Sequence, residues 1–85
     1  MKIEIRLFGQ VKDFFETSGF DIQMGKEEIV VDDIKKILIQ KSLEPEKSET
    51  LLKESALATE ARILQSDETI QAGGVIFVLP PVCGG

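Results

Sequence analysis

The feature that most constrains the fold is a run of five apolar residues, Val75–Leu79, followed at once by Pro80 and Pro81. Such a run, rich in β-branched residues and preceded by the Gly73–Gly74 turn, is typical of a central strand covered on more than one side. Proline has no N–H group to donate to a β-ladder, so strand pairing must stop at Pro80. We expect a domain over residues 1–81 and a flexible, projecting tail over residues 82–85.

Two further segments alternate apolar and polar side chains, which is the two-residue period of a half-buried strand. In residues 2–7 the apolar side chains occupy the odd positions. In residues 20–24 they occupy the even positions, between Gly19 and Gly25. Each segment is therefore predicted to be a strand.

A short helix is expected soon after the first strand. Val11, Phe14 and Phe15 have the i, i+3, i+4 spacing of one helical face. The spacing predicts a helix over residues 10–18, with Gly19 in the left-handed conformation that ends many helices.

A longer helix is predicted before Lys41. Apolar residues recur at helical spacing from Val30 to Leu38, with Asp32 and Asp33 in the first turn and Lys41 near the last. Acidic groups near the start and a basic group near the end both complement the helix dipole.

The segment that follows contains only short elements. Residues 44–46 read as irregular, and Ser48 is placed to cap a short helical turn. Residues 56–58 and 62–64 are candidate strands, and residues 66–68 read as a turn. The resulting order favours an α+β layer with a mixed sheet and helices on one face, which agrees with a β-grasp.

Composition excludes several classes of function. The 85 residues suit one domain, and the net charge of −5 argues against nucleic acid as a partner. Cys83 is the sole cysteine and histidine is absent, so a self-contained metal site and histidine-based catalysis are not expected. No apolar stretch suits a membrane span or a signal peptide, so we expect a cytoplasmic protein.

The expected chemistry lies in the tail. Gly84 and Gly85 lack β-carbons, so the tail can enter a narrow channel, and Pro80 and Pro81 stiffen its exit. The Gly85 carboxylate is a poor electrophile. An ATP-dependent partner would first convert it to an acyl adenylate, from which a sulfur donor displaces AMP.

The ending Pro80–Gly85 resembles the tail of the MoaD family, the small subunits of molybdopterin synthase. The resemblance extends to residues 8–11 after the first strand, to the Val31–Ile34 helix start and to the turn region over residues 67–74. It implies a ubiquitin-like β-grasp fold in which Gly85 carries a thiocarboxylate and residues 80–84 form the tail that the partner binds. By this resemblance the chain does no catalysis alone and donates sulfur within the synthase complex.

The resemblance also implies partners. An E1-type adenylating enzyme similar to MoeB would use ATP to activate Gly85, and a cysteine desulfurase or rhodanese would supply the sulfur. The tail would then enter a large subunit similar to MoaE, in a heterotetramer that converts precursor Z, a cyclic pyranopterin monophosphate, to molybdopterin. No permanently bound cofactor is implied.

Two other functions share the same tail. The chain would alternatively carry sulfur for thiamine thiazole or for tRNA thiolation, or be a ubiquitin-like modifier joined to lysines through Gly85. A thiol role for Cys83 in receiving sulfur is a further hypothesis, motivated by its position beside the glycines.

Some other residues have simpler explanations. Phe8, Phe14 and Phe15 are expected to pack in the core rather than to form a partner surface. The acidic pairs at 27–28 and 32–33 are explained by a turn and a helix start rather than by acid–base catalysis.

Overall fold

The computed structural model describes residues 2–81. Nine elements follow one another along these residues: β1 (Lys2–Leu7), the 3-10 helix η1 (Gly9–Phe14), β2 (Gly19–Gln23), β3 (Glu28–Val30), α1 (Val31–Lys41), α2 (Pro45–Glu54), β4 (Ala56–Ala58), β5 (Thr69–Gln71) and β6 (Val75–Leu79). None of the helices in this part of the chain is long and apolar enough to cross a bilayer.

Four strands form a mixed sheet in the order β2-β1-β6-β4. The first and last strands, β1 and β6, pair in parallel, with Ile5 opposite Ile76. The β1–β2 and β4–β6 pairs are antiparallel. The predicted strands at 2–7, 20–24, 56–58 and 75–79 are therefore confirmed to within a residue, and β6 has a neighbour on each side, as expected of a central strand.

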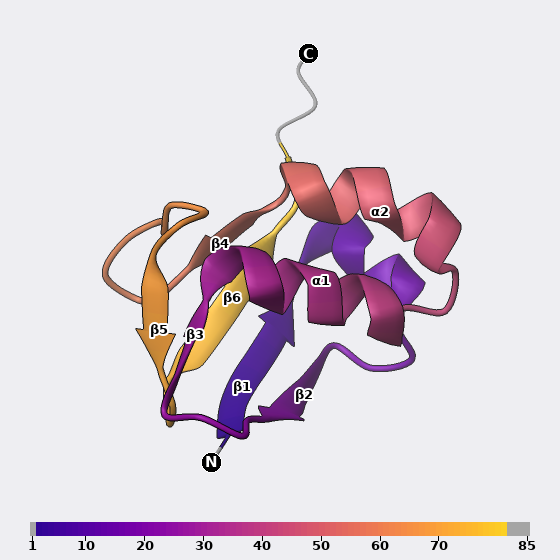
Figure 1. The fold of residues 1–85 in the computed structure, drawn as a ribbon. Coiled ribbons are helices and arrows are strands. Elements are labelled where there is room, and N and C mark those ends of the chain that lie inside the picture. Colours follow the sequence, from indigo (N-terminus) through magenta and orange to yellow (C-terminus); the bar gives the residue numbers. More distant parts are fainter. Residues whose placement is uncertain (1, 82–85) are drawn as a thin grey trace.

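The two α-helices cover one face of this sheet (Figure 1). Their buried side chains, among them Ile34, Leu38 and Leu52, form one cluster with the inward side chains of β1 and β6. The opposite face of β6 is only half-buried, at Val75, Phe77 and Leu79. The expectation that β6 is covered on more than one side is therefore wrong, because the helices pack against a single face.

The predicted longer helix is confirmed as α1. Asp32 and Asp33 lie in its first turn and Lys41 in its last, while its buried side chains are Val31, Ile34 and Leu38. The Ser42 N–H group donates to the Ile39 carbonyl at 3.2 Å, which closes the final turn.

The predicted helix over 10–18 is shorter and tighter than expected. It is a 3-10 helix that ends at Phe14, and Val11 is its buried residue. The Phe15 N–H group donates to the Lys12 carbonyl at 3.0 Å, so the chain turns there into extended backbone. Gly19 does not cap a helix. It begins β2, and a β-carbon there would lie 2.9 Å from the Ile5 carbonyl oxygen, so glycine permits close strand approach rather than a left-handed turn.

Ser48 also has a role that differs from the predicted cap. The helix α2 starts at Pro45, which suits a first helical position because its nitrogen needs no partner there. Ser48 lies one turn further on, fully buried, with its hydroxyl 2.7 Å from that of Ser42 at the end of α1. The two hydroxyls therefore satisfy each other where the helices meet.

A second, two-stranded sheet was not predicted. It pairs β3 with β5, with Ile29 opposite Ile70. The candidate strand over 62–64 forms only an isolated bridge, between Ala58 and Ile63.

Candidate functional site

The predicted site residues fall on both sides of the boundary of the described structure. Pro80 and Pro81 are described, and both are half-buried. Val82, Cys83, Gly84 and Gly85 lie outside the described residues. The geometry therefore defines the base of the tail, while the roles of the four terminal residues stay predictions.

Gly9 and Pro80 contact each other where the chain leaves the sheet. Gly9 has a φ of 58°, a left-handed conformation that favours glycine. A β-carbon at Gly9 would lie 2.8 Å from Cγ of Pro80, so glycine is also required by space. Just before this contact, the Phe8 N–H group donates to the Val78 carbonyl at 3.2 Å. This bond and the Gly9–Pro80 contact together fix the direction in which β6 ends.

An apolar patch lies on the outer face of the sheet beside this exit. Strand alternation and register place four apolar side chains on this face, and we call them the outer patch: Phe8, Ile63, Phe77 and Leu79. The rings of Phe8 and Phe77 have centroids 5.8 Å apart at an angle of 51°. Phe8 is 43% exposed and Ile63 is 60% exposed, and exposed apolar side chains that gather on one face often mark an interaction site. The outer patch is thus suited to contact a partner that also receives the tail.

The prediction that Phe8 packs in the core is wrong. Phe8 continues the alternation of β1, in which even positions face outward, so its ring lies on the solvent side of the sheet. Phe14 and Phe15 are half-buried, and the Phe15 ring packs 5.6 Å from that of Phe20. The strand period of β1 was visible in the sequence and, extended by one residue, would have placed Phe8 correctly.

Beyond the aromatic pair, the outer face becomes charged. The register places Arg6 opposite both Gly19 and Phe77, and Arg6 pairs with the Glu4 carboxylate. Lys2 pairs with Asp21 at 3.3 Å along the same side of the sheet. The outer patch therefore has a polar border, as protein interfaces commonly do.

An ion pair that the sequence analysis missed orders the loop that carries Ile63. Two nitrogens of the Arg62 guanidinium donate to the two carboxylate oxygens of Glu68, and the Gln65 N–H group donates to Glu68 as well. These donors, with the Arg62 hydrogen bonds first, lower the pKa of Glu68 to about 2. Arginine and glutamate six residues apart in a loop give no periodic pattern, so only the folded backbone reveals this pair.

Glu28 and Asp33, from the acidic pairs considered as acid–base candidates, each have a structural partner. Glu28 accepts a hydrogen bond from the Gln71 amide at 3.2 Å across the β3–β5 pair. Asp33 lies in the first turn of α1 and pairs with Lys36 at 3.9 Å. Within residues 2–81, no group of three His, Cys, Asp or Glu side chains is placed to hold a metal ion. These observations agree with the structural explanation of both pairs.

Comparisons with known proteins were made once this geometry was in hand. A scan against protein-family models and a search of curated proteins found no match. Among solved structures, subunit 1 of the molybdopterin-converting factor of Helicobacter pylori, in a complex with subunit 2, is 28% identical with a TM-score of 0.63, and each chain is covered in full.

Two more solved structures are similar to this chain at lower identity. A molybdopterin converting factor subunit 1 of Pyrococcus furiosus is 19% identical with a TM-score of 0.76, covering 95% of this chain and 98% of the other. The small archaeal modifier protein 1 of Haloferax volcanii is 15% identical with a TM-score of 0.74, also covering 95% and 98%. The expected ubiquitin-like β-grasp fold is thereby confirmed, because this chain shares it with the solved structures of molybdopterin converting factor subunit 1 and of the small archaeal modifier protein.

Proposed function

We propose that this protein is the sulfur-carrier small subunit of a molybdopterin synthase, with sulfur held as a thiocarboxylate on Gly85. The observation that carries the proposal is the full-length likeness to subunit 1 of the Helicobacter pylori complex, at 28% identity. The Gly9–Pro80 contact supports it, because that contact directs the chain out of the sheet immediately before the Val82–Gly85 segment.

The proposed chemistry takes place at one carbonyl carbon. In the active site of a MoeB-like enzyme, the Gly85 carboxylate attacks the α-phosphorus of ATP and releases pyrophosphate. A cysteine desulfurase or rhodanese, carrying sulfur as a persulfide, then attacks the acyl carbon and displaces AMP, which leaves an acyl disulfide between Gly85 and the donor cysteine. A thiol attacks the sulfur of the donor cysteine, forms a disulfide with it and releases the Gly85 thiocarboxylate. The thiocarboxylate sulfur is ionised at neutral pH and polarisable, as a thiolate is, and therefore suits nucleophilic transfer.

The tail and the outer patch would act together on the large subunit, a MoaE-like protein. Gly84 and Gly85 present no side chains, so they pass into a narrow active site where the sulfur is transferred to precursor Z. Phe8 and Ile63 supply exposed apolar area beside the tail, and aromatic residues of this kind often dominate the energy of an interface. The catalytic groups would belong to the large subunit.

A second candidate is a ubiquitin-like modifier. The likeness to the small archaeal modifier protein of Haloferax volcanii favours it, although at 15% identity this likeness concerns the fold. The acyl adenylate is common to both functions. A modifier would then be attacked by a lysine amine and leave an isopeptide bond, whereas a carrier gives up sulfur and recovers a carboxylate. Carriers for thiamine thiazole or tRNA thiolation differ only in the acceptor.

The decisive experiment is reconstitution with ATP, a MoeB-like enzyme and a sulfur source, read by intact mass. We expect the mass gain of one carboxylate oxygen replaced by sulfur, and conversion of precursor Z to molybdopterin after a MoaE-like subunit is added. Deleting Gly85, or making Gly84→Leu, should abolish sulfur transfer while the melting temperature stays the same, because the core lies elsewhere. Sulfur transfer by either variant, or isopeptide adducts without any thiocarboxylate, would refute the carrier.

Cys83→Ala is the matched tail control. It leaves both glycines intact, so an unchanged rate of thiocarboxylate formation would remove the thiol hypothesis for Cys83. Normal thiocarboxylate formation by Cys83→Ala would also show that the effect of the glycine variants comes from the glycines and not from any change in the tail.

The outer patch is tested by Phe8→Ser and Ile63→Ser, with Leu43→Ser as a control of similar exposure away from this face. We expect each patch variant to weaken binding of the MoaE-like subunit by about tenfold or more, as for side chains that anchor an interface. Leu43→Ser should bind normally. Equal affinities for all three would mean that the large subunit binds elsewhere.

A further inference from the structure

One edge of the main sheet has free backbone groups. The Leu7 N–H group donates to the Ser18 carbonyl at 2.8 Å, so this pair is a hydrogen-bonded one in the antiparallel β1–β2 ladder. Because hydrogen-bonded and non-hydrogen-bonded pairs alternate along the ladder, the backbone N–H and C=O groups of Phe20 and Ile22 point toward β1. Those of Asp21 and Gln23 point away from the sheet. Among residues 2–81, those outward groups have no backbone partner.

The opposite edge, at β4, is treated differently. The loop after β4 folds back along it, with the Thr59 N–H group donating to Arg62 at 2.9 Å and the Leu64 N–H group donating to Leu57 at 2.8 Å. Covering an edge in this way is a common protection against pairing with other chains. The described part of the chain protects β4 and leaves β2 open.

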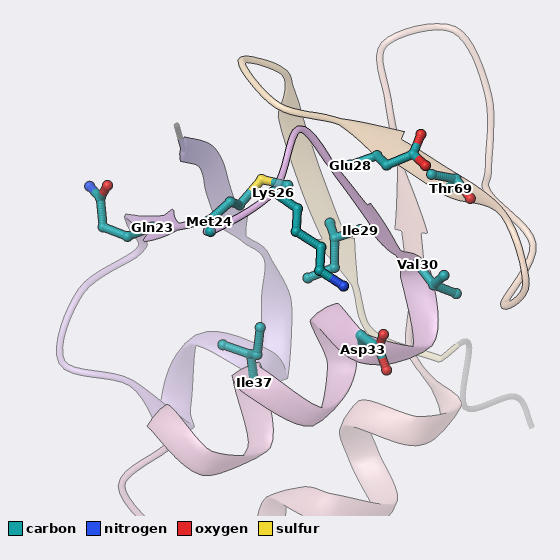
Figure 2. Close-up of a pocket in the computed structure, with 10 residues that line it drawn as sticks. Gln23, Met24, Lys26, Glu28, Ile29, Val30, Asp33, Ile37 and Thr69 are labelled. Carbon is teal, nitrogen blue, oxygen red and sulfur yellow. The ribbon is translucent and has the colours of Figure 1, made fainter.

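Two hollows lie along the open edge, between β2 and α1. One, of about 530 Å³, is lined by the apolar side chains of Met24, Ile29 and Ile37 (Figure 2). The other, of about 420 Å³, is lined by Phe15, Phe20 and Leu43. The helix α1 borders both hollows, with Ile37 at the first and Lys41, one helical turn later, at the second; we call the two hollows and the β2 edge between them the groove. The edge therefore combines free backbone groups with apolar hollows at both ends.

Basic side chains accompany the acidic ones at both ends of the groove. Glu28 and Asp33 border the Met24 end together with Lys26, whose side chain extends over the hollow in Figure 2. At the other end Lys41 is balanced by Glu16. Asp21, between them, is paired with Lys2 at 3.3 Å. Asp33 is likewise paired, with Lys36 at 3.9 Å. The groove is therefore close to neutral at both ends, and the negative charge that a basic segment would meet is the net charge of −5 of the whole chain.

We propose that the β2 edge binds an extended, basic segment of a partner protein, with apolar side chains in the two hollows and a positive charge that complements the net charge of −5 of this chain. Strand addition of this kind gives affinity through backbone hydrogen bonds and specificity through alternate side chains. From Phe20 to Met24 the edge spans about 13 Å, so about five residues suffice. A second copy of this chain fits poorly, because its net charge is −5 and antiparallel β2 strands would bring two Asp21 residues together.

This binding is independent of sulfur carriage. The β2 edge and the β6 exit are separated by β1 in the sheet order, so a partner on β2 leaves the tail accessible. The proposal therefore adds a second interaction surface to the molecule and does not depend on the proposed function.

The test uses a defined probe, the capped peptide Arg-Val-Thr-Ile-Ser-Val-Arg, titrated into the isotope-labelled protein and followed by NMR. Arginine at both ends allows either strand direction. We expect amide shifts at Asp21 and Gln23 and along the groove side of α1, and at least about tenfold weaker binding when both arginines are replaced by glutamate. Absence of shifts at millimolar peptide, or shifts confined to the outer patch, would overturn the proposal.

Backbone pairing is tested on the peptide, which avoids any effect on folding. Two peptides are compared: one is N-methylated at both valines and the isoleucine, and the other at the threonine and the serine. Because only alternate N–H groups of an added strand face the β2 edge, only one of these two peptides should lose affinity, by about tenfold. Equal behaviour of the two would exclude strand addition.

A protein variant gives the complementary result. Asp21→Pro removes an outward N–H group without touching the β1 ladder, and Asp21→Ala is the control that keeps it. Only the proline variant should bind weakly, while thiocarboxylate formation at Gly85 should be unchanged in both. Concentration-dependent self-association of the natural chain that Asp21→Pro abolishes would instead assign the edge to a second copy.

Discussion

Replacing Gly9 by alanine is the most direct test of how the tail exit is built. Gly9 has a φ of 58°, where an L-residue with a β-carbon is disfavoured by about 1–2 kcal/mol. The new β-carbon would also lie 2.8 Å from Cγ of Pro80, a ring atom that cannot rotate away. Overpacking of this kind adds about 1–3 kcal/mol. The expected loss of unfolding free energy is therefore about 2–5 kcal/mol.

Urea denaturation measures this loss, and thermal unfolding supports it. For a domain of this size each kcal/mol shifts the melting temperature by about 4–8 °C. Gly25→Ala is the matched control, because no atom lies within 4 Å of its β-carbon position and its φ is not positive. Gly73→Ala, at a φ of 91° but in open space, isolates the backbone contribution from the contact with Pro80.

A double mutant separates the two contributions at Gly9 itself. Pro80→Ala removes the ring atom that would lie 2.8 Å from the new β-carbon at position 9. The Cβ atom of residue 80 remains, at 3.9 Å, which is an ordinary contact distance. Gly9→Ala should then cost about 1–2 kcal/mol, the backbone part alone. The reasoning fails if Gly9→Ala costs no more than Gly25→Ala, or costs the same with proline and with alanine at position 80.

Two further predictions concern the outer face and the 62–68 loop. Phe77→Ala should lower the free energy of unfolding by about 1–3 kcal/mol in urea denaturation, because the Phe77 side chain is only half-buried beside Phe8. This is less than for a fully buried phenylalanine, and a loss above about 4 kcal/mol would mean that the ring is fully covered. The pKa of Glu68 is lowered to about 2 in the folded state, so its ion pair with Arg62 stabilises the fold above the unfolded pKa and is lost as the pH falls toward 2. The melting temperature of Glu68→Gln should therefore lie below that of the natural chain at neutral pH and approach it in acid, and a constant difference across this range would contradict the pairing.

The elements with a clear period were predictable from sequence. β1, β2 and β6 show the alternation or the apolar run of strands, and α1 shows helical spacing with complementary charges at its ends. Strands β3 and β5 have three residues each, too few for a period to be recognised, and they form because the turns around them bring Ile29 opposite Ile70.

The candidate site was predictable only in part. The proline and glycine pattern of the tail could be read directly, and Pro80 does begin where strand pairing ends. Its contact with Gly9 joins residues from opposite ends of the chain, so no local pattern reveals it. The exposed position of Phe8 and of Ile63 likewise depends on which sheet face the helices leave open.

The place of β6 in the sheet affects how the molecule is made. β6 is the last described element to emerge during synthesis, yet β1 and β4 do not pair with each other, and each pairs with β6. A nascent chain that lacks residues 75–79 therefore contains β1 and β4 without the strand that pairs with both. Stable folding must wait until these residues have left the ribosome. A folded molecule consequently always has in place the strand that leads into Pro80 and Pro81.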